Sequence, residues 1–334
     1  MLRLFLCCRL SRSRQRSSTS TTSDSNNDKM GTATATEAAG TSCALYDMPE
    51  VGNVKVKRDR AAAAAAEVHE EIFFRQPESE STAAELQRDE ILFKQPESTH
   101  LGDCPICFLP LQIDPYKSTL QSCCSKVICK GCRHANKLRG GNKNLHHTCL
   151  MCRQPTPRSK KEISTYSMKR VAANDPVAIQ ERGKKHYQEG HYRGAFEYWT
   201  KAAELGNVDA IYLLSLLYRD GRGVEKNEEK EWHQLEEAAI AGHVGARFTL
   251  AHNEKTRRGR TDRAVKHLII AANLGCDYSM KALKQCHENG EVDDDKFTTA
   301  LHAHQAAVDE MNSPQREEQA NYDRSIEEWF CADK

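Results

Sequence analysis

Cys104-Pro-Ile-Cys107 opens, and Cys149-Leu-Met-Cys152 closes, a segment that also holds Cys123-Cys124 and Cys129-Lys-Gly-Cys132. This segment, residues 104–152, is called the cysteine module below. It contains eight of the 14 cysteines in this 334-residue chain. Structural zinc takes four ligands in a tetrahedron, and a CxxC pair suits it because one tight turn brings both sulfurs to the same side. Eight thiolates therefore predict two zinc ions.

The clustering of the cysteines also bears on the compartment. CxxC pairs without a secretory signal are typical of metal binding in a reducing compartment. Residues 1–18 carry five arginines, and no acid precedes Asp24, which is compatible with a mitochondrial-type presequence or with a plain basic tail. No apolar run approaches the roughly 18 residues that a bilayer requires. We expect a cytoplasmic or nuclear protein, with N-terminal organelle targeting as the alternative.

The N-terminal third has little apolar surface and contains a short duplication. Residues 1–58 are rich in Ser, Thr, Asn and Ala, and we expect them to be disordered. Residues 59–103 are predicted to be a partly helical linker. Within it, the nonapeptide EIFFRQPES at 71–79 returns at 90–98 as EILFKQPES, with seven of nine positions identical. The duplication has no role, or it is a linear motif whose second copy packs on the cysteine module.

The order of the cysteine pairs resembles the RING finger family, in an all-cysteine variant. The resemblance implies a small cross-brace fold with interleaved ligands. The first zinc would be bound by Cys104, Cys107, Cys129 and Cys132, and the second by Cys123, Cys124, Cys149 and Cys152. Two positions depart from the commonest pattern, because Lys126 stands where a histidine is usual and Leu150 where a proline is usual. If one cysteine of the middle pair does not bind, the reserve ligands are His134, His146 and His147.

The RING resemblance also implies a function. In that family Ile106 would contact a ubiquitin-conjugating enzyme, Arg153 would bridge that enzyme and ubiquitin, and Pro155 would lie on the same face. Catalysis would be positioning of the charged enzyme rather than nucleophilic chemistry. The leading hypothesis is a RING-type ubiquitin-protein ligase. The alternative is a non-catalytic zinc-binding scaffold, in which Ile106 packs internally and Arg153 is a solvated charge.

The charge of residues 104–174 suits a docking role. This stretch has 13 Lys and Arg against two acids, Asp114 and Glu162. Such a field would steer an acidic partner. Nucleic-acid binding is a third hypothesis, but the aromatic platform that single strands require is missing, since only Phe108, Tyr116 and Tyr166 occur there. Residues 153–174 are predicted to be a basic linker.

Three copies of Ala-Ala-x-x-Gly, ending at Gly206, Gly242 and Gly275, set a period of 36 and 33 residues in the C-terminal half. This period is typical of helix-hairpin solenoids. The predicted helix pairs are 176–189 with 191–205, 208–218 with 228–241, and 244–255 with 262–274. The pattern resembles Sel-one-like repeats, relatives of the tetratricopeptide repeat, over about three units at residues 175–290. Such arrays bind proteins on a curved surface, which would select a substrate here.

Large aromatic residues of the repeats are expected in the core between the helices. They are Tyr187, Tyr192, Tyr198, Trp199, Tyr212, Tyr218 and Trp232. Residues 291–334 are predicted to form two capping helices at 293–311 and 314–332. Phe297, Leu301, His304, Val308 and Met311 form a one-sided stripe on the first of them. A dimer seam is the alternative use of this stripe.

Overall fold

The structure is a computed structural model that describes residues 86–139 and 148–332, with side chains up to Ser325. The predictions for residues 1–58, for the first copy of the motif and for His146 and His147 lie outside the described residues. Residues 86–317 belong to one compact unit, and the last helix continues from Glu318 into another. No helix in the described part of the chain has the length and apolar character needed to cross a bilayer.

The cysteine module is built from short elements. A 3-10 turn, η1 (Pro115–Lys117), leads into β1 (Ser118–Gln121), which pairs antiparallel with β2 (Lys126–Cys129) and is followed by α3 (Lys130–Arg139). Asp114 starts η1 because its side chain accepts a hydrogen bond from the Tyr116 amide at 2.8 Å. The hairpin register places Ser118 opposite Cys129 and Gln121 opposite Lys126.

The basic linker contains a helix that was not predicted, α4 (Lys160–Ala172). Ser159 is its N-cap, and the Ser159 hydroxyl accepts from the Glu162 amide at 3.2 Å. The Glu162 carboxylate accepts in turn from the Arg158 amide at 2.8 Å. This is a variant of the Ser-x-x-Glu capping box, in which the carboxylate bonds the amide before the N-cap instead of the Ser159 amide. Helix α4 packs against α5, the first helix of the repeats.

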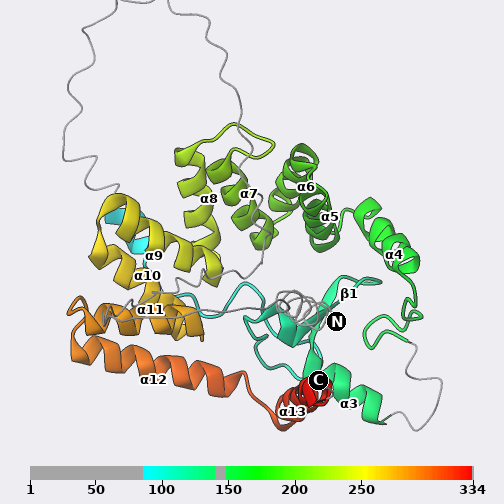
Figure 1. Ribbon diagram of the computed structural model, residues 1–334. Coiled ribbons are helices and arrows are strands. Elements are labelled where there is room, and N and C mark those ends of the chain that lie inside the picture. The colour runs from blue at the N-terminus through cyan, green and yellow to red at the C-terminus, as the bar shows by residue number, and fades with distance from the viewer. Residues whose placement is uncertain (1–85, 140–147, 333–334) are drawn as a thin grey trace, which may run out of the picture. The chain divides into compact units, whose positions relative to one another are not determined.

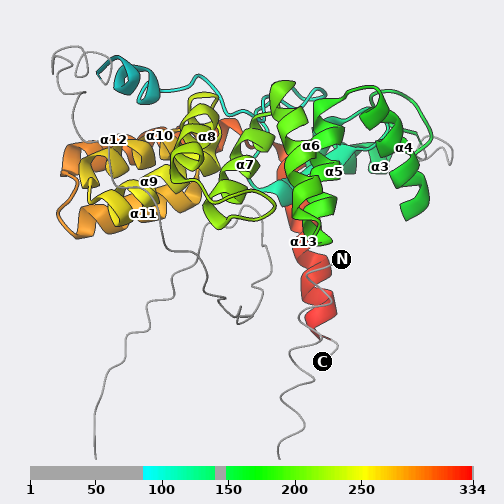
Figure 2. The same ribbon diagram turned by 90° about the horizontal axis from the view of Figure 1, so that it is seen from above.

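The C-terminal half is a helical-repeat array (Figures 1 and 2). Consecutive helices pack as hairpins, and each hairpin packs on the next. The pairs are α5 (Pro176–Gln188) with α6 (Tyr192–Glu204), α7 (Val208–Asp220) with α8 (Glu228–Ile240), α9 (Val244–Arg258) with α10 (Thr261–Asn273), and α11 (Asp277–Glu288) with α12 (Asp294–Glu310). The prediction of a helical-repeat solenoid is therefore confirmed, and the structure adds a fourth hairpin.

The Ala-Ala-x-x-Gly segments form the same turn three times. Each glycine is left-handed, with φ of 83°, 83° and 85°, and its amide donates to the carbonyl of the second alanine at 2.8–3.0 Å. Glycine reaches this conformation without the steric cost that a Cβ would bring. Five of the six alanines are fully buried where the helices approach, namely Ala202, Ala238, Ala239, Ala271 and Ala272.

Aromatic residues fill the first hairpins as expected. Trp199 is 1% exposed, stacks on Tyr187 at 5.5 Å between ring centroids, and donates its indole N–H to the Gln180 carbonyl at 3.1 Å. A Cβ on Gly183 would come within 2.4 Å of the Trp199 ring, so this glycine makes room for the indole. Tyr187, Tyr212 and Trp232 are also buried, whereas Tyr192, Tyr198 and Tyr218 are partly buried against the same clusters.

The predicted capping stripe is the inner face of α12. Phe297 stacks on His287 of α11 at 4.4 Å, and Met311 is buried against Gly275. Leu301 is the exposed member, at 44%. The stripe that would have formed a dimer seam is therefore covered in part within the chain. The second predicted capping helix, α13 (Pro314–Ala332), instead places its first turn on the cysteine module.

The second copy of the duplicated motif packs on the array, so the alternative in which it packs on the cysteine module was wrong. Leu92 is 1% exposed and lies in a cluster with Trp232 and Leu235 of α8 and Leu250 of α9. The cyan chain in Figure 1 passes α9 and α10 before it enters the cysteine module. The physical reason is that Leu92 and Phe93 require an apolar surface, which the array provides and the small core of the cysteine module does not.

Candidate metal centre

The structure brings the eight cysteines of the module together as two groups of four. In each group the four sulfurs lie within 4.8 Å of one another. The Sγ–Sγ separations are 3.9 Å for Cys107–Cys129, 3.8 Å for Cys124–Cys149 and 3.3 Å for Cys123–Cys152. A tetrahedron with Zn–S of about 2.3 Å requires sulfurs about 3.8 Å apart. The donor sets therefore fit zinc, and their members are Cys104, Cys107, Cys129 and Cys132 in the first tetrad, and Cys123, Cys124, Cys149 and Cys152 in the second.

Two different sequences build the same Cys-x-x-Cys turn. After Cys104-Pro-Ile-Cys107 the chain turns left-handed at Phe108, with φ 55°, and the Phe108 amide donates to the Cys104 carbonyl at 2.8 Å. After Cys149-Leu-Met-Cys152 it does so at Arg153, with φ 58°, whose amide donates to the Cys149 carbonyl at 2.9 Å. An antiparallel bridge closes each turn, at Asp103–Pro110 and Thr148–Pro155.

The vicinal pair Cys123-Cys124 lies in the turn between β1 and β2. Ser125 follows in the left-handed region, with φ 55°, and its amide donates to the Gln121 carbonyl at 2.8 Å. This bend lets both sulfurs reach the second tetrad, which neighbouring side chains in an extended strand would not do. His134, a reserve ligand, is buried in α3 and belongs to neither tetrad.

Each tetrad contains a thiol whose pKa is lowered by backbone amides and a thiol whose pKa is raised. Burial opposes ionisation of Cys104, but amides of Cys129, Cys107 and Ile106 lower its pKa to about 7. Burial likewise opposes ionisation of Cys149, and amides of Cys152 and Met151 lower its pKa. Burial, then the neighbouring thiols, raise the pKa values of Cys123 and Cys132. A divalent cation is the partner that would let all four thiols of a tetrad ionise together.

Arg316, in the first turn of α13, covers the first tetrad. Its guanidinium donates to the Pro110 carbonyl at 2.7 Å, to the Leu109 carbonyl at 3.2 Å and to Cys107 Sγ at 3.5 Å. The residue is 6% exposed, and a Cβ on Gly131 would come within 2.9 Å of it. Sequence reasoning missed this residue, since nothing in the local sequence links position 316 to a segment 206 positions earlier.

The predicted partner contacts are exposed. Ile106 is 37% exposed in the first Cys-x-x-Cys turn, and Arg153 and Pro155 are exposed at the second. Phe108, which sequence reasoning did not assign to this role, is 77% exposed and follows directly on Cys107. The two turns thus present apolar side chains and one cation to solvent.

A third cluster of metal-type side chains joins the segment before Cys104 to the array. His100 Nε2 lies 3.0 Å and His243 Nε2 3.4 Å from Asp209 Oδ1, and the two imidazoles stack at 4.3 Å. His243 Nδ1 accepts from the Ala246 amide at 3.0 Å, so its Nε2 carries the proton and faces Asp209. The cluster is therefore a hydrogen-bonded latch rather than a metal site.

The charges of this latch follow from its surroundings. Burial, then the neighbouring His100, lower the pKa of His243 to about 4, so the ring is neutral at pH 7. Burial opposes ionisation of Asp209, but hydrogen bonds from His100 and His243 hold its pKa well below the usual range.

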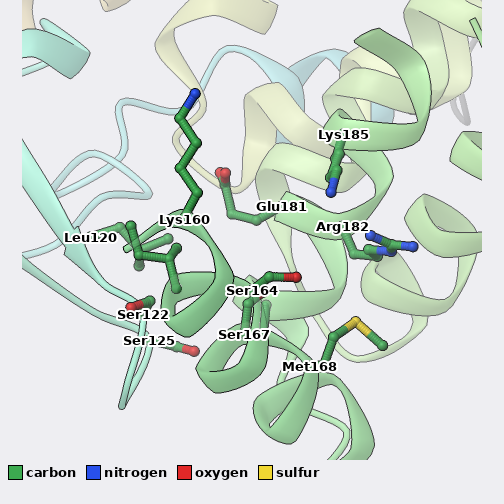
Figure 3. Close-up of a pocket in the computed structure, with 12 residues that line it drawn as sticks. Leu120, Ser122, Ser125, Lys160, Ser164, Ser167, Met168, Glu181, Arg182 and Lys185 are labelled. Carbon is green, nitrogen blue, oxygen red and sulfur yellow. The ribbon is translucent and has the colours of Figure 1, made fainter. Parts of the chain in front are cut away.

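A pocket of about 250 Å³ lies between the β1–β2 hairpin, α4 and α5 (Figure 3). Leu120, Ile163 and Met168 supply apolar walls, each at least 36% exposed. Three cations and one acid line it, namely Lys160, Arg182, Lys185 and Glu181, together with serines from the hairpin and α4. The excess of cationic over acidic side chains in this lining favours a ligand with negative charge.

Comparisons with known proteins give structural neighbours only. No family model matches the sequence, and no curated protein matches it. Among solved structures, the chain is similar to a Sel1 repeat protein from Oxalobacter formigenes, at 22% identity and a TM-score of 0.38, over 46% of this chain and 66% of that chain. It is also similar to c5321, a protective antigen of uropathogenic Escherichia coli with an SLR fold, at 21% identity and a TM-score of 0.37. That match covers 51% of this chain and 42% of the other, so the chain spans less than two thirds of either protein.

Proposed function

We propose that each cysteine tetrad binds one structural zinc ion and that the array binds a protein partner. The observation that carries the proposal is the interleaving of the tetrads. The first joins residues 104–107 to 129–132, and the second joins 123–124 to 149–152. Zinc would hold these separated segments together, and its binding free energy would act as folding free energy. Exposed residues of the two turns would then form a docking surface.

The finer proposal is that this surface binds a ubiquitin-conjugating enzyme and that the protein is a RING-type ubiquitin ligase. Ile106, Arg153 and Pro155 would contact the enzyme, and the array would hold the protein substrate. The ligase would act by holding the charged enzyme and the acceptor in a reactive arrangement, with no nucleophile of its own. Exposure of these three side chains beside the predicted zinc sites supports this proposal.

The test uses the full chain, purified under reducing conditions. We expect two zinc ions per chain by elemental analysis and self-ubiquitination with at least one member of a panel of conjugating enzymes. Ile106→Ala combined with Arg153→Ala should reduce the rate at least about tenfold with unchanged zinc content. The matched control is Leu301→Ala with Arg193→Ala, because both residues are exposed on the array.

Each other outcome has a definite meaning. A folded chain without zinc would overturn the whole proposal. Two bound zinc ions with no transfer by any conjugating enzyme would overturn the ligase and leave the scaffold alternative. Retention on DNA or RNA that falls steeply with salt would point instead to nucleic-acid binding through the basic region.

A further inference from the structure

The duplicated nonapeptide has a binding site on the array. Its second copy lies across helices α8, α9 and α10, and the turned view in Figure 2 shows the cyan chain running along the array there. This surface is called the motif groove. It is defined by Trp232, Leu235, Arg247, Arg263, His267 and Asn273.

Two adjacent apolar side chains anchor the second copy. Leu92 is buried at 1% exposure against Trp232 and Leu235. Phe93 lies 4.7 Å from the His267 ring, with the Arg263 guanidinium 4.8 Å from the phenyl centroid. A cation at this distance from an aromatic face is attracted to it. The groove therefore favours an aromatic side chain at the position that Phe93 occupies.

Arg247 shows that the groove is built to hold a peptide backbone. It is 0% exposed in α9, and its guanidinium donates to the carbonyls of Leu92 and, at 3.5 Å, of Lys94. Burial lowers its pKa to about 10, so it remains charged at neutral pH. A buried cation requires acceptors, and these acceptors come from main-chain carbonyls that any peptide in the groove would offer.

Polar side chains fix both ends of the peptide. Asp89 accepts from Arg263 at the first end. At the other end, the Gln95 amide donates to the Ile270 carbonyl at 3.4 Å and accepts from Asn273 at 3.2 Å. The groove therefore recognises an acid, an apolar residue, an aromatic residue and a glutamine at fixed spacing.

The first copy has the same chemistry at every one of these positions. The residues that correspond to Asp89, Leu92, Phe93 and Gln95 are Glu70, Phe73, Phe74 and Gln76, each 19 positions earlier. Residues 70–79 lie outside the described residues, so the comparison rests on their sequence. Phe74 and Gln76 are identical to Phe93 and Gln95, and Glu70 and Phe73 keep the acidic and apolar character of Asp89 and Leu92. The first copy therefore retains the kinds of side chain that the second copy uses in the groove.

We propose that the motif groove is a sequence-specific peptide-binding site and that residues 70–79 compete with residues 89–98 of the same chain for it. Phe73 is larger than Leu92, so the first copy binds roughly 10- to 100-fold less well. The second copy is therefore the resting occupant. Because both occupants belong to one chain, the ratio of the two states does not depend on protein concentration.

The exchange would change how the cysteine module is tethered. His100, which follows the second copy, bonds Asp209 and lies 3.4 Å from the Gly242 carbonyl. The corresponding residue after the first copy is Ser81, which lacks an imidazole. Occupation by the first copy would thus open the latch and place 19 more residues between the groove and Cys104. The module would then move away from the array.

The test places the photo-crosslinking residue p-benzoylphenylalanine at position 74 of the full chain, with crosslinked peptides mapped by mass spectrometry. We expect weak crosslinking to Val244–Asn273, the α9–α10 hairpin. Phe73→Leu, which makes the first copy match the second, should increase it about tenfold without altering the second copy. Phe73→Asp is the matched control and should abolish it. Leu92→Asp with Phe93→Ala should increase crosslinking further if that variant folds.

The contrary results are specific. Crosslinking that does not reach residues 244–273 in the Phe73→Leu background overturns the proposal, because that variant leaves the array and its occupant intact. Crosslinking that grows with protein concentration and links two chains also overturns it, since the exchange would then be between copies. Equal crosslinking yields from Phe73→Leu and Phe73→Asp would mean that the groove does not distinguish side chains at this position of the motif.

Discussion

The cysteine module and the helical array are held together by different interactions. Among the described residues of the module, four of the six buried apolar side chains are cysteines, and the other two are Leu111 and Ile128. The array buries three large clusters, centred on Trp199, Trp232 and Leu283. Apolar burial of about 25 cal/mol per Å² supports the array, whereas so small a core cannot support the module. Under the proposed zinc binding, the metal ions would stabilise the module as apolar packing stabilises the array.

Removal of metal should give the largest effect and separate the two regions most clearly. Structural zinc contributes apparent binding free energies of about 10–16 kcal/mol per ion. A strong chelator should therefore unfold residues 104–152 while the array keeps its helices. Hydrogen exchange with mass spectrometry should show lost protection in β2 and α3 and unchanged protection in α6–α10. Cys104→Ser should reproduce the loss. The control Cys286→Ser, at a buried cysteine of α11, should retain both zinc ions.

The reverse experiment weakens the array and leaves the module intact. Trp199→Ala should lower the free energy of unfolding of the array by about 3–5 kcal/mol, because it removes a side chain that is 1% exposed. Urea unfolding followed by circular dichroism measures this loss, and zinc content should remain at two ions. Tyr278→Ala, at a residue 46% exposed, is the control and should change the stability by less than about 1 kcal/mol. Loss of zinc from Trp199→Ala would mean that the two regions fold as one.

Acid should weaken the array through its buried histidines. The pKa of His243 is lowered to about 4 by burial and by His100, although Asp209 opposes this shift. The unfolded chain therefore binds more protons below about pH 6.5, and stability is lost as the pH falls from there towards 4. The expected loss between pH 7 and pH 5 is about 2 kcal/mol from His243. Burial, then Arg247 and Arg263, lower the pKa of His267 to about 3, which adds a similar loss.

The variant His243→Asn isolates the contribution of His243 to the pH dependence of stability. Asn207 occupies the same position in the preceding repeat, where its side chain accepts from the Ala210 amide at 2.8 Å, so the variant keeps a helix cap. Urea unfolding by tryptophan fluorescence at pH 7 and pH 5 should show about half of the wild-type pH dependence. An unchanged dependence would exclude His243 as its source.

The smallest predicted effect concerns the contact between α13 and the module. Arg316→Met removes the donors that contact Pro110, Leu109 and Cys107. We expect zinc to leave the first tetrad about tenfold faster, equivalent to about 1.4 kcal/mol, with little change at the second. A chromophoric chelator measures the two release phases. Arg193→Met, at an exposed arginine of α6, is the control. Equal acceleration of both phases would contradict the specific contact.

Local sequence patterns predicted helices well where the residues that start and end the helix lie within the same short segment. The repeat glycines and the helical period predicted α5–α10 to within a few residues, because helix ends depend on neighbours three or four positions away. Helix α4 was missed although its Ser159-x-x-Glu162 capping signal was present, since its basic composition suggested a linker. The fourth hairpin was missed because α12, predicted only as a capping helix, lacks the Ala-Ala-x-x-Gly ending that marks the second helix of the other three hairpins.

By itself, the sequence determined that eight cysteines are grouped with metal-ligand spacing and that helical hairpins repeat with a period near 35 residues. Only the tertiary structure decided that the second motif copy binds the array, that Arg316 covers the first tetrad, and that His100 bonds Asp209. These contacts join residues 109–209 positions apart. No spacing rule reaches that far, because such pairs depend on how the segments pack and not on the residues beside them.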